Sequence, residues 1–475
     1  MVLSSHLAST LLGALAAFAD SAAVRGGTVV NPDGTRIEKG VVVIQDGRIT
    51  AVGGPETPIP GDAVVHEADG RLVFPALVLA HTQIGLDITN ENVPVAPFVN
   101  VYDSIEPNSA EYEDCLRTGI GTVHVIQGHN TVIGGLSRII RPLGDMIDAM
   151  TVRADVALKV SISPRGGFNR MTQLAELRRA FADLAAHVEA VAEKRFEEEK
   201  KKKDEKVLVL PDEAAKQGMA LVTIDDLDAR WRTLWRASKG EVPLFVHCDR
   251  AMDVMRGIEW LKEMKLLEKS TFVVGTEAFK AVDALKAAGR PVVLSGVLLH
   301  READPVTGEI KETFVPKVFA DAGVPFVLQP NGFGFSADGL LWYQAARCVR
   351  EGIARDVAVK AITQGAADAI GLGGELGSLA AGKWGNVAIL SGDPLDQATF
   401  VDRMLVEGRL AYERATDRRL KELTTGQELP PADAVKAEAP AAPTETPAPA
   451  PAGDEKPAEK PAESKPAGDG SGKQN

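Results

Sequence analysis

The sequence predicts an α/β fold, with a helix-covered parallel sheet and a small β-rich unit built from both flanks. Between about residues 72 and 372, short apolar strands alternate with helical stretches. Repeated βα units of this kind give a parallel sheet with helices outside it. On either side of this region the pattern changes to short β-rich pieces separated by turns. We expect these two flanks to form one discontinuous domain.

The two flanks share strand and turn signals. Residues 27–30 and 40–53 are rich in β-branched side chains, and Asp46-Gly47 between two apolar runs is a strong hairpin signal. After Gly377 the β-rich character returns, and residues 401–412 have Glu407-Gly408 at their centre, which predicts a second hairpin. Both flanks therefore predict a small β-sheet unit.

The central region contains apolar segments with the length of buried strands. One of them, residues 73–80, ends in the polar cluster His81-Thr82-Gln83. A strongly helical stretch, Leu174 to Lys203, separates two of the others and ends in a charge run that is typical of a solvated helix end. The remaining predicted strands are residues 121–126, 156–161, 243–248, 270–274, 291–295 and 325–329.

Composition limits the class of protein. The chain has 475 residues, of which 45% are hydrophobic and 25% charged, as in ordinary globular proteins. A net charge of -13 without any basic stripe argues against a nucleic-acid partner. The only cysteines are Cys115, Cys248 and Cys348, which give neither a disulfide framework nor a Cys-x-x-Cys pair.

The two ends differ from the rest of the chain. Residues 7–19 form a short apolar run ending in Ala-Phe-Ala, which predicts a secretory signal peptide within residues 1–22 and a periplasmic or secreted protein. The alternative is a buried N-terminal helix in a cytoplasmic protein. The run is too short for a lasting membrane span. Residues 428–475 are rich in Ala, Pro, Glu and Lys, which predicts a disordered tail.

Four ordered segments resemble the amidohydrolase superfamily, in particular its composite-domain members of the imidazolonepropionase and dihydroorotase type. Within the second segment, Ala76 stands where Gly is usual and Leu79 where Asp is usual. The resemblance implies a (β/α)8 TIM-type barrel over residues 73–372 and a composite β-sandwich domain over residues 23–72 plus 373–427. The segments are Gly40–Gly53 (GVVVIQDGRITAVG), Gly70–His81 (GRLVFPALVLAH), Thr363–Gly371 (TQGAADAIG) and Gly377–Lys383 (GSLAAGK).

The resemblance also implies a metal site at the carboxyl ends of the barrel strands. Members of the superfamily cut C–N bonds with metal-activated water. Their first strand ends in His-x-His, which here is His81 followed by Gln83, and an amide oxygen is a weak ligand. His247 matches the strand-5 histidine. The expected metal positions are therefore His81, Gln83 and His247.

Two further residues are candidates for the catalytic chemistry. Lys159 lies where the resemblance places a strand-4 lysine, which in some relatives is carbamylated and bridges two metals. Asn331 lies near the expected strand-8 Asp, although an amide is a much poorer proton acceptor than a carboxylate. The strand-6 histidine is missing, with Val274 or Gly275 in its place.

Other side chains near predicted strand ends could complete an altered site. A rebuilt site would hold zinc or another divalent metal, whereas an inactive one would need no cofactor. His81, His247 and Lys159 could equally be hydrogen-bonded or ion-paired core residues. The candidate substitutes are His124, His129, His300, Asp249, Glu277 and Asp338.

Two functions follow from this pattern, and a third alternative is a structural or envelope-associated module that the tail tethers. The first is hydrolysis of C–N bonds other than peptide bonds in a small amide-like substrate. The second is a catalytically inactive barrel that binds a ligand or serves as a partner subunit. The partner would be a second copy of the chain or an active paralogue.

Overall fold

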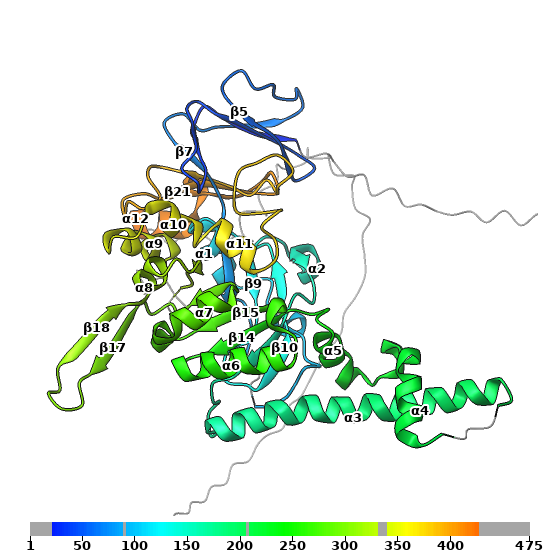
Figure 1. Cartoon of the computed structure of the whole chain (residues 1–475). Helices are drawn as coiled ribbons and strands as arrows, with labels where there is room; N and C mark the ends of the chain where they lie inside the picture. The colour runs from blue at the N-terminus through cyan, green and yellow to red at the C-terminus, as the bar shows by residue number, and fades with distance from the viewer. Residues whose placement is uncertain (1–20, 89–91, 206–208, 331–339, 427–475) are drawn as a thin grey trace, which may run out of the picture. The chain divides into compact units, whose positions relative to one another are not determined.

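A computed structural model of the chain describes residues 21–88, 92–205, 209–330 and 340–426 (Figure 1). Almost all of the predicted signal segment, the Pro-rich tail and both Asn331 and Asp338 lie outside these ranges. The chain divides into two units at Asp417. The only described element of the second unit is helix α12 (Arg418–Thr425). None of the described helices is long and apolar enough to cross a membrane.

The larger sheet of the central region contains most of the predicted strands. Its parallel members pair in the order β13, β14, β15, β16 and β19, and β10 joins the first of them antiparallel. The core strands bury both faces, as expected for a sheet covered by helices. The strands are β10 (Ile133–Leu136), β13 (Leu158–Ser161), β14 (Leu244–Cys248), β15 (Ser270–Val274), β16 (Val292–Leu294) and β19 (Phe326–Val327).

A second sheet continues from the first through one stretch of chain. β8 (Leu77–Thr82) pairs parallel with β9 (Ile120–Val125), and β9 pairs antiparallel with β11 (Arg138–Ile140), which β12 (Thr151–Arg153) extends. β10 and β11 follow each other directly, so this stretch pairs with β13 on one side and with β9 on the other.

The expectation of a wholly parallel sheet was therefore wrong at this stretch. A parallel crossover needs a connection of about a dozen residues or more. The chain between Val125 and Ile133 is too short for one, and it returns antiparallel instead.

The barrel is not closed by a β-ladder in the part of the chain that the structure describes. At the seam between β8 and β19, the backbone N–H of Val78 donates to the Ile362 carbonyl, and that of Leu328 to the Ala361 carbonyl, both at 3.1 Å. The α/β content is shown, whereas the eight-stranded closed barrel stays a prediction.

Strands from both ends of the chain form two sheets that pack face to face. One sheet has the order β22-β21-β20-β7-β2-β3 and the other the order β5-β4-β1-β6. Side chains of both sheets share one buried cluster, including Ile44 and Ile389. Both predicted hairpins are present, turning at Gln45↔Arg48 and Val406↔Arg409. The predicted domain boundaries stay predictions. The strands are β1 (Ala22–Arg25), β2 (Thr28–Val30), β3 (Arg36–Ile37), β4 (Val41–Gln45), β5 (Arg48–Gly53), β6 (Val64–Glu67), β7 (Leu72–Pro75), β20 (Val387–Leu390), β21 (Val401–Val406) and β22 (Arg409–Glu413).

Helices follow most strands of the central region. The longest, α3 (Arg170–Lys202), begins with an Asn169 side-chain cap and packs against α4 (Pro211–Gly218) (Figure 1). A hairpin of β17 (Leu299–Ala303) and β18 (Ile310–Phe314) precedes α8. The other helices are α1 (Ala110–Arg117), α2 (Ile147–Met150), α5 (Ala229–Ser238), α6 (Ala251–Glu263), α7 (Val282–Ala288), α8 (Val315–Asp321), α9 (Leu341–Arg350), α10 (Arg355–Lys360) and α11 (Gln364–Ala369).

The link from α11 back to the β-sandwich depends on two glycines in the left-handed region. Gly371 has φ +74° and Gly377 has φ +87°. A Cβ atom added at Gly371 would meet nothing within 4 Å, whereas one at Gly377 would lie 2.6 Å from the Cα of Gln364. The Lys383 ammonium holds the same link by donating to the carbonyls of Gly373 and Leu376.

We expect Gly377→Ala to destabilise the protein more than Gly371→Ala. Both substitutions place a side chain at positive φ, which costs about 1–2 kcal/mol. Only Gly377→Ala also forces a Cβ against backbone, and overpacking adds about 1–3 kcal/mol. Urea unfolding of both variants would measure the difference, and equal losses of stability would contradict this account.

Candidate functional site

Strands of the two central sheets bring three of the predicted site residues together at one edge. His81 lies near the end of β8, Lys159 lies within β13, and His247 lies at the end of β14. His129 follows β9 in the loop that reaches the same edge. In barrel enzymes this carboxyl edge is where the active site forms. We call these four residues the imidazole–lysine cluster.

The Lys159 ammonium is the centre of the cluster. Its Nζ lies 2.8 Å from His81 Nε2 and 3.0 Å from His129 Nδ1. The Lys159 side chain is completely buried, and His81 is only 6% exposed. An ammonium group can only donate hydrogen bonds. Both ring nitrogens are therefore acceptors, so His81 carries its proton on Nδ1 and His129 on Nε2.

The histidine rings stack along the mouth of the site. The His129 ring lies on the His247 ring, with centroids 3.8 Å apart and planes 16° apart. The His81 and His129 rings are nearly parallel at 5.0 Å. Stacking holds three imidazoles from different strands and loops in one array, which brings together three of the residues considered from the sequence.

A serine pair fixes the orientation of His247. The Ser161 hydroxyl donates to the Ser163 carbonyl at 2.9 Å. Its oxygen lies 3.2 Å from His247 Nδ1. Because the hydroxyl proton is already used, His247 Nδ1–H must be the donor. His247 Nε2 is then the nitrogen that carries the lone pair.

Ser163 connects the site to a buried carboxylate. The Ser163 hydroxyl donates to Asp253 Oδ2 at 2.8 Å and accepts the backbone N–H of Asp249. Arg170 Nε donates to the other oxygen of Asp253 at 2.7 Å. This network ties the loops after β13 and β14 together and supports His247. Ser161, Ser163 and Asp253 carry no sequence motif, and only strand alternation places Ser161 on the same face as Lys159.

His124 does not belong to the cluster, although the sequence analysis predicted it as a candidate substitute for a missing metal ligand. Its Nδ1 donates to the Ala80 carbonyl, and its Nε2 accepts from the Ser137 hydroxyl, both at 2.7 Å. Both ring nitrogens are therefore used inside the sheet. His300 is separate as well, since its Nδ1 contacts the Thr276 hydroxyl at 3.0 Å.

Burial keeps the histidines of this region neutral. Desolvation, followed by the charge of Lys159, holds the pKa of His81 and His129 well below 6.5. The same causes lower the pKa of His247 to about 3. Desolvation lowers the pKa of His124 to about 4. At neutral pH the imidazoles of the cluster are therefore uncharged and surround one lysine.

The donor set does not fit a divalent metal. Gln83 is a half-buried amide, and Val274, where the strand-6 histidine is expected, is an apolar side chain that is 2% exposed. The lone pairs of His81 and His129 are directed at an ammonium. Among the described residues, no three His, Cys, Asp or Glu side chains are placed to hold a metal ion. Asn331 lies outside the described residues.

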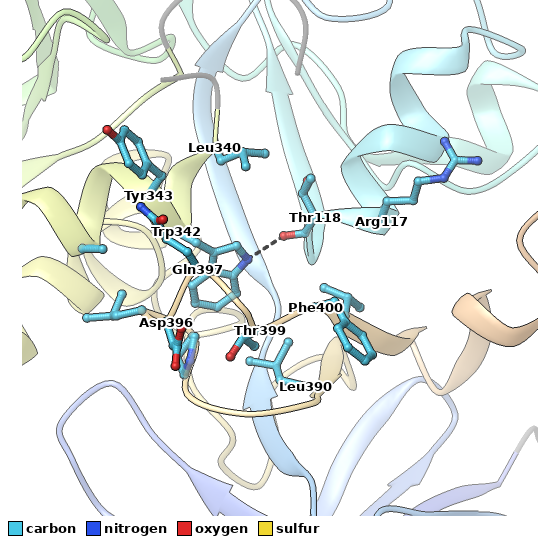
Figure 2. A pocket seen from close by; sticks show the side chains of 14 residues that line it. Arg117, Thr118, Leu340, Trp342, Tyr343, Leu390, Asp396, Gln397, Thr399 and Phe400 are labelled. Carbon is cyan, nitrogen blue, oxygen red and sulfur yellow. Dashed lines mark hydrogen bonds between the residues drawn. The ribbon is translucent and has the colours of Figure 1, made fainter. Parts of the chain in front are cut away.

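A separate cavity of about 390 Å³ lies away from the cluster (Figure 2). The Trp342 indole lines it and donates to the Thr118 carbonyl at 2.7 Å. Thr118 precedes β9, so this cavity lies by the amino-terminal end of that strand, whereas the cluster lies at the carboxyl ends. None of the four cluster residues lines the cavity.

Comparison with known proteins finds similar sequences. Amidohydrolase tasK of Hapsidospora irregularis is 21% identical over 412 residues, which cover 79% of this chain but only 40% of that protein. Imidazolonepropionase of Maricaulis maris is 27% identical over 404 residues, covering 79% and 92%. No protein-family model matches the chain.

Comparison of structures shows the fold. An amidohydrolase from Thermotoga maritima superposes with a TM-score of 0.66 at 22% sequence identity, covering 82% of this chain and all of that one. At this identity the likeness concerns the arrangement of strands and helices, and it leaves open what the site does.

We expect the buried imidazoles to make the protein sensitive to acid. Their pKa values rise to about 6.5 on unfolding, so the unfolded chain binds more protons between that pH and about pH 3. Above about pH 6.5 these imidazoles should contribute no pH dependence to the free energy of unfolding. It should fall as the pH drops, by up to about 1.4 kcal/mol per pH unit for each imidazole.

Urea unfolding at several pH values between 7.5 and 5 would measure this slope in the wild type and in His124→Asn. Removing one imidazole should reduce the slope, whatever it does to stability at pH 7.5. An unchanged slope would contradict the assignment of a low pKa to His124.

Proposed function

This chain belongs to the amidohydrolase superfamily, and we propose that it hydrolyses C–N bonds other than peptide bonds in small amide-like molecules. The observation that supports this proposal is the imidazole–lysine cluster. It gathers His81, Lys159 and His247 beside the carboxyl ends of β8 and β14, where barrel enzymes have their active sites.

The chemistry available to the cluster is proton transfer and charge stabilisation. His247 Nε2 carries a lone pair and can accept a proton from a water that attacks the amide carbonyl. Ser161 holds this ring in the required tautomer. The low pKa of His247, about 3, makes it a weak base at neutral pH. We therefore expect slow hydrolysis from the described residues alone.

The second candidate function is binding without catalysis. The replaced positions Gln83 and Val274 favour it, because neither can supply the ligand that the superfamily pattern requires. In this case the barrel would hold an amide-like ligand or pair with a second copy or an active paralogue. The two candidates share one site and differ in whether the bound molecule is cleaved.

We expect His247→Ala to lower hydrolysis about 100-fold, at the lower end of the about 10²–10⁴-fold that general base catalysis contributes, because His247 is a weak base. Release of amine from a panel of small linear and cyclic amides would be measured with the wild type and the variant. His300→Ala is the matched control, since this histidine also lies near a strand end but contacts Thr276.

Thermal shifts with the same amides would accompany the assay. Cleavage that is lost in His247→Ala and kept in His300→Ala would support the hydrolase. Stabilisation of the wild type by an amide without any cleavage would favour the binding function instead.

A further inference from the structure

We propose that the Lys159 ammonium is the built-in cation of this site and that it excludes divalent metal from the place where two imidazole lone pairs converge. The inference uses the site of the proposed function, but it does not depend on hydrolysis. It follows from the disagreement between the metal site that the superfamily pattern implies and the contacts that the structure shows.

The two rings are aimed as metal ligands would be. His81 Nε2 and His129 Nδ1 both point at one position, and the atom at that position is Lys159 Nζ, at 2.8 and 3.0 Å. Zinc binds imidazole nitrogen at about 2.0–2.1 Å. A small inward shift of both rings would therefore suit a zinc ion if the ammonium were absent.

Lys159 cannot easily leave this position. Its neighbours Leu158 and Val160 pair with β14 on one side and with β10 on the other. The side chain is completely buried. A divalent ion beside this ammonium would meet strong repulsion, because two like charges a few ångströms apart in a buried site are poorly screened.

Among the described residues, the remaining donors are too few to offset that repulsion. Val274 supplies none, and an amide such as Gln83 is a weak and neutral ligand. His247 Nε2 is the third imidazole lone pair of the cluster. These neutral acceptors therefore suit a singly charged hydrogen-bond donor such as the Lys159 ammonium better than a divalent metal ion.

The test is to replace the ammonium by an apolar chain of similar length. Zinc binding by wild type, Lys159→Met and the double variant Lys159→Met/His81→Ala would be measured by competition with a chromophoric chelator. We expect little binding by the wild type. Lys159→Met should bind about one zinc per chain at least about tenfold more tightly, and the double variant should lose this gain, since ligand changes cost about 10–100-fold.

Two controls complete the experiment. Lys383→Met removes another partly buried lysine, which holds the α11 link, and it should leave zinc binding as in the wild type. Circular dichroism would show whether each variant is folded. Because no substrate is present, the outcome is separate from the success or failure of the hydrolysis assay.

The wild type by itself also tests the inference. Elemental analysis of protein purified without chelator should give well under one zinc per chain. One zinc per chain that is lost in Lys159→Met would overturn the inference. So would a mass increase showing carbon dioxide bound to Lys159, because a carbamate would be a ligand rather than a cation.

Discussion

The hydrogen bonds from Lys159 to His81 and His129 are the constraint to which the rest of the site responds. Burying a lone ammonium is costly unless hydrogen bonds compensate it. Here two imidazole nitrogens accept from it, and they can do so only while the rings are neutral. Burial and the lysine charge favour that neutral form, so the charge and the tautomers of the cluster determine each other.

The surrounding fold supports this arrangement from several directions. His81 and His247 lie near the carboxyl ends of β8 and β14, and Lys159 lies two residues earlier in the register, opposite Phe245 of β14. The antiparallel stretch of β10 and β11 lies between β9 and β13, so the loop carrying His129 starts beside β8 and reaches across to Lys159. In a continuous run of parallel βα units, a helix would follow this loop. Here the chain returns at Ile133 as an antiparallel strand instead.

Much of the fold could be predicted from the sequence, because buried strands have a clear apolar pattern. All the predicted strands of the central region appear within a few residues of their expected bounds, and Asp46-Gly47 makes the expected turn. The antiparallel stretch was not predicted, because Gly134, Gly135 and Arg138 interrupt the apolar, β-branched pattern that marks the parallel strands. Its direction depends on the length of the preceding connection, which was the available signal.

The site was predictable only in part, for a physical reason. Strand position places His81, Lys159 and His247, but the tautomers depend on contacts made between distant segments. Ser161 orients His247, and an isolated serine in a strand carries no signal of that role. His129 was considered as a substitute ligand, whereas its contact with Lys159 follows from the path of a loop.

The departures from the superfamily pattern share one property, which accounts for their occurring together. Gln83, Val274 and, in the sequence, Asn331 are each uncharged where that pattern has a ligand or a carboxylate. A divalent ion needs several strong donors and anionic partners nearby. An ammonium that is already attached to the chain needs only acceptors, and neutral imidazoles provide them. Without the carboxylate and two of the histidines, the site lacks the strong and anionic donors that a divalent metal needs. It still has the neutral imidazole acceptors that the Lys159 ammonium needs. Of the retained histidines, His81 accepts a hydrogen bond from Lys159. His247 stacks on His129, which also accepts from Lys159.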